Sequence, residues 1–115
     1  MKDRSGDKAW VLLILDAISE IESYTSNDSF ESFSSHSMKK FATVKQIEII
    51  GEAANHISSE IKHSYSEVSW REIIGIRNIL IHEYFGVDER IVWEVVNNDL
   101  PALKKQFQII LKEQF

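Results

Sequence analysis

Hydrophobic residues recur at steps of three and four along almost the whole chain, and this spacing is the feature that most restricts the fold. It predicts helices over residues 8–24, 38–61, 70–84 and 89–115. Helix breakers are sparse, with one Pro and four Gly in 115 residues, and no segment alternates as a strand would. The chain is therefore expected to form an all-α, antiparallel bundle of four long helices in a single domain over residues 1–115.

Two interruptions mark where these helices are expected to bend or stop. Gly51 lowers helix propensity by about 1 kcal/mol relative to Ala, so we expect either a close helix crossing or a kink there. Pro101 cannot continue the backbone hydrogen bonds of a preceding helix. One helix should thus end near Asn97 and another begin after Asn98 or Asp99, which gives a kinked or split C-terminal segment.

Polar residues and glycine predict where the third and fourth helices begin and end. Ser69 and Glu72 have the spacing of a capping box in front of the third helix. Gly86 is expected to end that helix, and Asp88 to cap the next one. Residues 26–37 contain six Ser and are predicted to form a loop that can hold one short turn of helix.

Charge, hydropathy and the lack of Cys exclude several classes of function for this chain. The chain has 13 Lys and Arg against 18 Asp and Glu, and this net charge of -5 repels phosphate chains, so general affinity for nucleic acids is not implied. The longest apolar run, residues 9–15, is far shorter than the roughly 20 residues of a membrane helix. The absence of Cys excludes a thiolate metal site and a Cys nucleophile. Without a signal-peptide pattern, the protein is expected to be cytoplasmic.

Polar side chains interrupt the apolar pattern of the predicted third helix. At about 100° per residue, Arg77 falls in the middle of the apolar stripe, and Tyr84 follows two turns along it. Asn78 and His82 are four residues apart and should meet at the edge of the stripe. The sequence thus predicts these polar side chains on one half of a helix surface.

Each of these residues also has a structural interpretation. Arg77 can be a buried cation satisfied by Glu52 or Asp16, or it can extend to the surface. His82 can be a core or capping histidine, and Tyr84 a core aromatic with its hydroxyl at the rim. Their occurrence together favours a functional role more strongly than any one of them alone.

The string Arg-Asn-Ile-Leu-Ile-His-Glu-Tyr at residues 77–84 resembles the Arg-x4-His-x-Tyr motif of the HepT-like toxins, a branch of the HEPN superfamily of helical ribonucleases. The flanking segments that resemble the family in order and spacing are residues 50–54, 70–73, 84–88, Trp93 and residues 98–101. The similarity extends from about Leu12 to the C-terminus. A HEPN-type helical bundle is the fold that this resemblance implies.

The resemblance implies a homodimer whose two motifs face each other across a groove and form one composite RNA-cleaving site. His82 is then the proton-transfer group, because its unperturbed pKa of about 6.5 suits transfer near neutrality. Arg77 is the cation for the phosphate, and Asn78 orients the imidazole or binds a phosphate oxygen. No metal ion or other cofactor is expected, since the four His lack the close spacing of metal ligands.

The same resemblance implies a protein partner. In HepT-like toxins, the tyrosine that corresponds to Tyr84 is modified with AMP by a minimal nucleotidyltransferase antitoxin. The added phosphate groups would neutralise Arg77 and block the groove. The chain is therefore expected to be the toxin of a toxin–antitoxin system, a metal-independent endoribonuclease that acts on tRNA or mRNA.

Two alternatives stay open at this point. One is a non-catalytic HEPN module that binds a nucleotidyltransferase, or a nucleotide at Arg77 and Tyr84. The other is a purely structural bundle in which Arg77 is a paired core charge. Lys39, Lys40 and Lys45 form a compact basic group that either guides RNA or is a solvated helix face.

Overall fold

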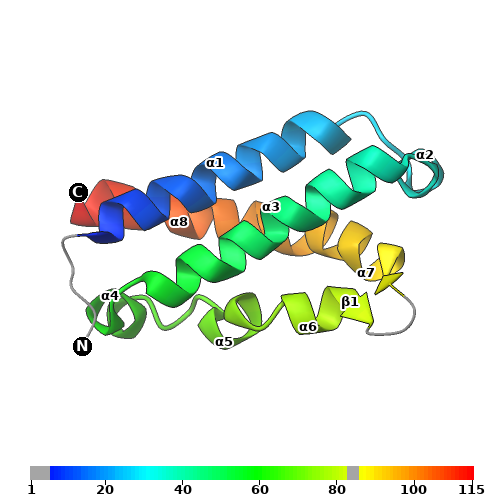
Figure 1. The fold of residues 1–115 in the computed structure, drawn as a ribbon. Helices are drawn as coiled ribbons and strands as arrows, with labels where there is room; N and C mark the ends of the chain where they lie inside the picture. Colours follow the sequence, from blue (N-terminus) through cyan, green and yellow to red (C-terminus); the bar gives the residue numbers. More distant parts are fainter. Residues whose placement is uncertain (1–5, 83–85) are drawn as a thin grey trace.

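The structure, a computed structural model, describes residues 6–82 and 86–115, without the side chains of Ile79, Ile81 and His82. Its helices are α1 (Asp7–Thr25), α2 (Phe30–Ser35), α3 (Ser37–His56), α4 (Ser59–Ser64), α5 (Trp70–Ile74), α6 (Arg77–Leu80), α7 (Glu89–Glu94) and α8 (Leu100–Gln114) (Figure 1). A π-helical turn, η2 (Val95–Asp99), joins α7 to α8, and the short strands β1 (Ile81–His82) and β2 (Gly86–Val87) pair antiparallel. The all-α prediction is confirmed. None of the helices in these residues combines the length and hydropathy of a membrane-spanning segment.

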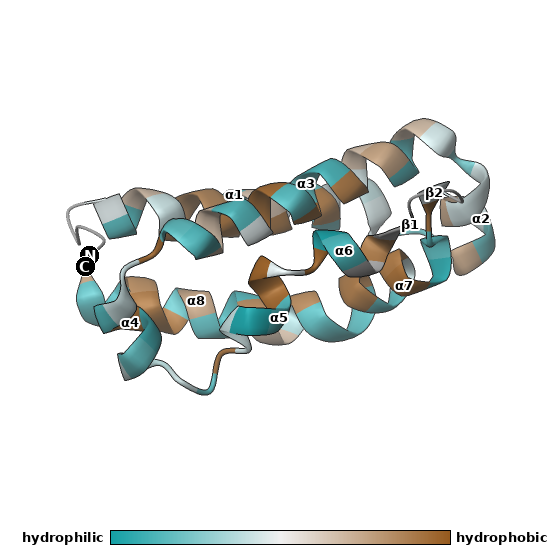
Figure 2. Cartoon of the chain, turned by 60° about the horizontal axis from the view of Figure 1, so that its bottom comes forward, coloured by the Kyte–Doolittle hydropathy of each residue, from teal (hydrophilic) through white to brown (hydrophobic). Residues whose placement is uncertain are grey.

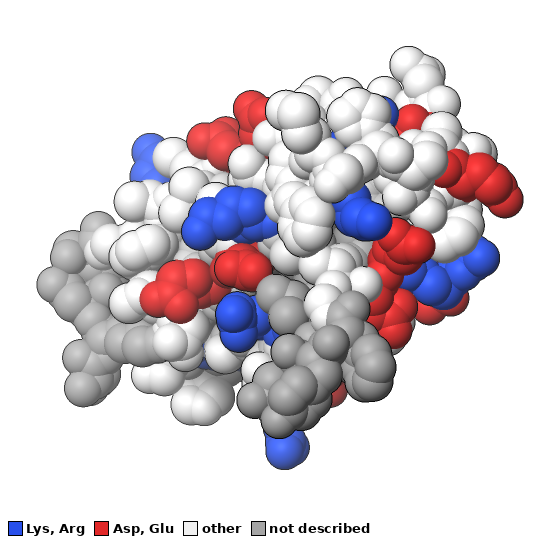
Figure 3. Space-filling model, turned by 45° about the vertical axis from the view of Figure 1, so that its right-hand side comes forward, with Lys and Arg blue, Asp and Glu red and all other residues white. Residues whose placement is uncertain are grey.

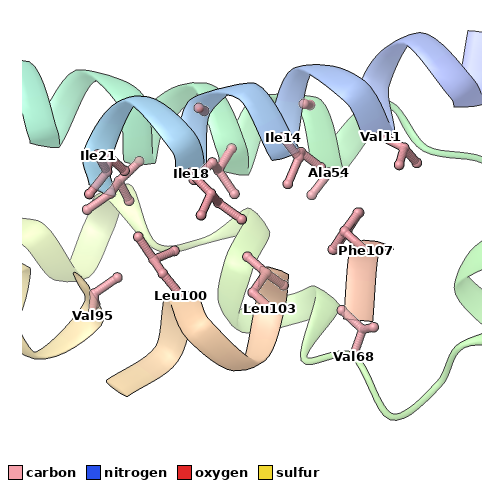
Figure 4. Close-up of a cluster of buried hydrophobic side chains, with 14 of the residues drawn as sticks. Val11, Ile14, Ile18, Ile21, Ala54, Val68, Val95, Leu100, Leu103 and Phe107 are labelled. Carbon is pink, nitrogen blue, oxygen red and sulfur yellow. The ribbon is translucent and has the colours of Figure 1, made fainter. Parts of the chain in front are cut away.

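The core lies between α1, α3 and α8, with α1 packed against both of the others. Figure 4 shows Val11, Ile14 and Ile18 of α1 on the side that faces Leu103 and Phe107 of α8, and all five side chains are buried. Full burial of an aliphatic or aromatic side chain stabilises a fold by about 1.5–3 kcal/mol. Most of the apolar stripe predicted for residues 8–24 is therefore the core face of α1, whereas Leu12 and Leu13 are 39% exposed.

Gly51 of α3 lies where the backbone of α5 comes close to that of α3. A Cβ atom at position 51 would lie 2.9 Å from the Ile73 carbonyl oxygen and 3.6 Å from that of Ile74. Only a residue without a side chain permits such an approach of two backbones. Of the two explanations expected for this glycine, the close crossing is confirmed, and α3 continues through Gly51 as one helix.

The predicted helix over residues 38–61 is divided in the structure. Its first part ends at His56, Ile57 is extended, and Ser58 is the N-cap of α4. The buried carboxylate of Asp7 accepts hydrogen bonds from the Ser58 backbone N–H at 2.8 Å and from the Ser58 hydroxyl at 2.6 Å. Because Asp7 is 51 residues away in sequence, the spacing of apolar residues contained no sign of this break.

The predicted continuous helix over residues 70–84 is wrong. In the structure α5 ends at Ile74, the four-residue α6 follows, and β1 then pairs with β2. The segment is rich in β-branched Ile and contains Gly75, and both residue types lower helix propensity. The hairpin satisfies backbone groups in another way, since the Asp88 N–H donates to the Leu80 carbonyl at 2.7 Å.

The predicted caps of the third and fourth helices have mixed outcomes. Ser69 is the N-cap of α5, but its side chain makes no capping hydrogen bond, so the predicted capping box with Glu72 does not form. Gly86 lies in β2 with φ 76°, a backbone conformation that glycine adopts readily, and so does not end a helix. Asp88 caps α7 as predicted, because its carboxylate accepts a hydrogen bond from the Ile91 N–H at 3.2 Å.

In the C-terminal segment, the first helix does not end near Asn97 as predicted but continues into a π-helical turn. The chain continues from α7 through η2 into α8, and Pro101 lies in the first turn of α8. Proline offers no N–H to the carbonyl four residues earlier, and the wider π turn accommodates the missing hydrogen bond. Asp99 is the N-cap of α8 as predicted, although its side chain makes no capping hydrogen bond.

Candidate functional site

Arg77 begins α6, where the chain has just left α5. Its side chain is 65% exposed, and Nε lies 3.8 Å from Oε1 of Glu48 on α3. The prediction that Arg77 lies in the middle of the apolar stripe of one continuous helix is therefore wrong. The break at Gly75 ends the helical register of α5, so angles counted along a continuous helix do not apply beyond it.

The carboxylate beside Arg77 is that of Glu48, and not of Glu52 or Asp16 as the structural interpretation expected. Glu52 pairs within α3 instead, and Asp16 is exposed on α1. Glu48 is thus a site residue that sequence reasoning missed. The position of Glu48 in the sequence indicates this role, because Glu48 lies one helical turn before Gly51, where α5 crosses α3.

The other predicted site residues lie in α6 and in the hairpin. Asn78 is exposed, and its backbone N–H donates to the Gly75 carbonyl at 3.1 Å. His82 belongs to β1 and pairs with Gly86, so it does not lie one helical turn from Asn78 as predicted. Tyr84 and the side chain of His82 lie outside the described residues, so their predicted contacts stay predictions.

Among the residues that the structure describes, the surroundings of Arg77 leave its guanidinium available to a ligand. The contact with Glu48 at 3.8 Å is longer than a hydrogen bond, for which about 2.7–3.2 Å is usual. Ion pairs of this exposed kind contribute about 0–1 kcal/mol. A phosphate group can therefore replace the carboxylate at little cost, and the guanidinium can bind it through two N–H donors. The guanidinium can also stabilise the additional negative charge that develops on the phosphate during the reaction.

Charges at the end of the bundle that carries α2 and α7 are mostly paired. Lys39 Nζ lies 2.8 Å from the Asp28 carboxylate, and Lys40 Nζ lies 2.7 Å from that of Glu89. These hydrogen bonds are the main reason that the pKa of each carboxyl is lowered. Figure 3 shows blue and red atoms interspersed on this face. Of the predicted basic group, two lysines are thus neutralised and Lys45 is exposed.

Neither a cavity nor a metal centre coincides with the predicted residues that the structure describes. A groove of about 460 Å³ lies between α3, α5 and the η2–α8 segment. Figure 2 shows that the chain between α5 and α6 is coloured mostly as hydrophobic residues. The wall of the groove includes the carboxylates of Glu72, Glu94 and Asp99 and neither Arg77 nor Asn78, so phosphate is repelled there. Within the described side chains, no three of His, Asp or Glu are grouped to hold a metal ion. Arg77 and Asn78 thus lie outside this groove and are exposed.

Comparison with known proteins places the chain among ribonucleases. The family profile described as "Ribonuclease HepT-like" matches residues 14–110. A protein of Methanocaldococcus jannaschii named a "putative RNase" is 35% identical over 103 residues, which are 90% of this chain and 94% of that protein. A "probable ribonuclease HepT" of Thermococcus cleftensis is 41% identical over 99 residues, 86% of this chain and 90% of its own.

A further relative, a "putative RNase" of Caldanaerobacter subterraneus subsp. tengcongensis, is 44% identical over 86 residues, 75% of this chain and 77% of that protein. No solved structure matches the chain. The range matched by the family profile contains Arg77, Asn78, His82 and Tyr84. The chain therefore belongs to the HepT-like ribonuclease family, as the motif at residues 77–84 predicted.

Proposed function

We propose that this protein is the toxin of a toxin–antitoxin pair, a cytoplasmic, metal-independent endoribonuclease that cleaves tRNA or mRNA as a homodimer. The observation that carries the proposal is the exposed Arg77, held loosely by Glu48 at 3.8 Å and followed five residues later by His82. Arg77 begins α6, and the chain passes directly from α6 into β1, where His82 pairs with Gly86. Family membership and the names of the relatives support a ribonuclease.

Cleavage needs one attack on phosphorus and two proton transfers. The ribose 2′-oxygen attacks the phosphorus while His82 accepts its proton, and the bond from phosphorus to the 5′-oxygen breaks. The partner subunit's His82 donates a proton to the leaving 5′-oxygen. Arg77 binds the non-bridging oxygens as their charge increases, and Asn78 adds an amide donor to a phosphate oxygen or to the imidazole. The products are a 2′,3′-cyclic phosphate and a 5′-hydroxyl end.

A second copy of the chain would find exposed apolar side chains on α3, the helix that carries Glu48. On α3, Met38 is 81% exposed and Phe41 is 56% exposed. Phe41 lies two turns before Glu48 and so on nearly the same side of α3, about 10 Å along the helix axis. Burial of these side chains against another subunit would bring two motifs together at a twofold seam.

The oligomeric state tests this surface. Phe41→Glu should convert a dimer to a monomer in light scattering and lower the cleavage rate. Ile109→Glu, at a residue that is 50% exposed on α8, is the matched control and should do neither. A Phe41 variant that stays dimeric would contradict this choice of interface.

Tyr84 is the proposed site of regulation. A partner minimal nucleotidyltransferase would transfer AMP from ATP to the Tyr84 hydroxyl and release pyrophosphate. Tyr84 follows His82 by two residues, and the phosphate added to its hydroxyl would compete with RNA for Arg77. Treatment with such an enzyme and ATP should add the mass of AMP to the Tyr84 peptide and stop cleavage, whereas Tyr84→Phe should continue to cleave. Undiminished cleavage by fully modified protein would contradict this role.

The decisive experiment is cleavage of unmodified tRNA and mRNA in EDTA by protein produced without a partner. The wild type should leave 2′,3′-cyclic phosphate ends, and Arg77→Ala and His82→Ala should each lower the rate by about 10²–10⁴-fold. Lys105→Ala, at an exposed cation on α8, is the control and should cleave like the wild type. If the wild type with unmodified Tyr84 cleaves nothing, or if His82→Ala cleaves as fast as the wild type so that the activity does not come from His82, the non-catalytic module that binds a nucleotidyltransferase or a nucleotide replaces the proposal.

Glu48 permits a separate test of how Arg77 acts. Glu48→Gln keeps the shape of the side chain and removes the charge that competes with phosphate for Arg77. We expect KM to fall by about threefold at low salt, equivalent to about 0.7 kcal/mol, with kcat and the melting temperature unchanged. The difference should vanish at high salt, where exposed charges are screened. A large decrease in kcat would instead show that Glu48 orients Arg77 in the transition state.

A further inference from the structure

Beside the hairpin, an exposed arginine lies over an aromatic ring. Arg90 is in the first turn of α7, and its guanidinium carbon lies 3.6 Å from the centroid of the Phe30 ring of α2. Arg90 is exposed and Phe30 is half-buried. We propose that Arg90 and Phe30 form a stacking platform for an unpaired base of single-stranded RNA, next to the Arg77–His82 motif. This inference rests on the proposed function, because it names a contact of the same substrate.

The platform is attached to the hydrophobic core. The Phe30 ring meets Trp93 edge-on, with centroids 6.4 Å apart and planes at 65°. The Trp93 ring in turn lies 5.2 Å from the ring of Phe33, which is fully buried. Aromatic contacts of this kind restrict the motion of each ring. The surface offered by Arg90 is therefore preorganised, which lowers the entropic cost of binding a base.

The charge of Arg90 is available to a ligand. The adjacent carboxylate, that of Glu89, accepts hydrogen bonds from Lys40 Nζ at 2.7 Å and from the Ser34 hydroxyl at 3.1 Å. Among the residues that the structure describes, Arg90 forms no salt bridge. Its guanidinium can therefore stack on a base through its plane while its N–H groups bind phosphate or the edge of the base.

The platform also lies close to the motif along the chain. Arg90 follows Gly86, the backbone partner of His82, by four residues, which span at most about 14 Å. The connection is held by Asp88, whose N–H donates to the Leu80 carbonyl at 2.7 Å and whose carboxylate caps α7. An RNA strand with a phosphate at the motif can thus place a base on the platform within a few nucleotides.

The chemistry of this surface favours single-stranded RNA. Bases in a duplex are covered by their neighbours, whereas unpaired bases stack on aromatic rings and on Arg guanidinium planes. Such stacking tolerates any base, since every base has a flat π face. Lys would keep the charge of Arg90 but not its plane, so Arg90→Lys separates stacking from simple attraction to phosphate.

Binding of an uncleavable RNA tests the platform. The probe is a fluorescent single strand of about twelve nucleotides whose 2′-oxygens are all methylated, so that it binds but cannot be cleaved. Anisotropy titrations at fixed salt should give a Kd for Arg90→Lys about tenfold above that of the wild type, equivalent to about 1.4 kcal/mol. The salt dependence should be unchanged because the charge is kept. Phe30→Leu, which keeps an apolar side chain, should weaken binding similarly.

Arg71→Lys is the matched control, since Arg71 is exposed on α5 and stacks on no ring among the described residues. It should bind RNA like the wild type, and melting curves should show all variants folded. A Kd for Arg90→Lys equal to that of the wild type or of Arg71→Lys would overturn the platform. If the wild type cleaves ordinary RNA, such a result overturns the platform alone. If the wild type fails to cleave, the proposed function has failed.

Discussion

Replacement of two glycines by alanine tests the crossing of α3 and α5, because the structure predicts opposite outcomes for them. At Gly51 a Cβ atom would lie 2.9 Å from the Ile73 carbonyl oxygen, about half an ångström inside ordinary contact. At Gly75 the nearest atom would be the Arg71 carbonyl oxygen at 3.4 Å, and the φ of −91° suits any L-residue.

Two effects determine the stability of Gly51→Ala. Overpacking against a backbone oxygen destabilises a fold by about 1–3 kcal/mol, while the higher helix propensity of Ala stabilises it by about 1 kcal/mol. Gly51→Ala is therefore expected to lower the free energy of unfolding by about 1 kcal/mol. In Gly75→Ala the nearest backbone oxygen lies at an ordinary contact distance of 3.4 Å. The substitution also lowers the entropy of the unfolded chain, so it should stabilise the fold by about 0.5 kcal/mol. The two variants should therefore differ by about 1.5 kcal/mol.

Urea unfolding followed by circular dichroism measures this difference as a shift in the midpoint at constant slope. In thermal melts, it corresponds to roughly 5 °C for a domain of this size. Gly51→Ala should also lower the rate of RNA cleavage, since a displaced α5 moves Arg77 of α6. The reasoning is refuted if Gly51→Ala is as stable as Gly75→Ala.

Two further predictions concern hydrogen bonds that tie distant segments together. Tyr65→Phe should lower the free energy of unfolding by about 1 kcal/mol at neutral pH, because the Tyr65 hydroxyl donates a hydrogen bond to Glu113 Oε1 at 2.6 Å. That hydrogen bond, and burial after it, raises the pKa of Tyr65 from its ordinary 10.0, so the stabilisation is complete below about pH 10 and is lost as pH rises through the higher folded value. An effect of Tyr65→Phe that does not shrink in alkaline urea titrations would contradict this assignment. Ser58→Ala should destabilise by about 2 kcal/mol, since its hydroxyl donates to the buried Asp7 carboxylate at 2.6 Å. Ser59→Ala, at the exposed next residue, is the control, and equal melting temperatures of the two variants would count against the buried bond.

Features of the fold that depend on residues close together in sequence could be predicted from the sequence. The spacing of apolar residues predicts α1 and its core face, and the position of Asp88 in front of a helix predicts the cap of α7. Gly51 was recognised as a site of close crossing or kinking, and the family resemblance rested on the string at residues 77–84. For the helix, its cap and the glycine, the relevant interaction is with neighbours in sequence, or the residue type itself limits the backbone.

The sequence by itself thus determined the helical class, the core face of α1 and the family to which the chain belongs. Tertiary structure alone decided that the third helix breaks at Gly75, that Arg77 is exposed, and that its neighbour is Glu48. A run of Ile and Gly is only a weak helix former, so the crossing at Gly51 and the β1–β2 pairing determine its backbone. Helical periodicity describes one element at a time, whereas the orientation of Arg77 depends on how two elements meet.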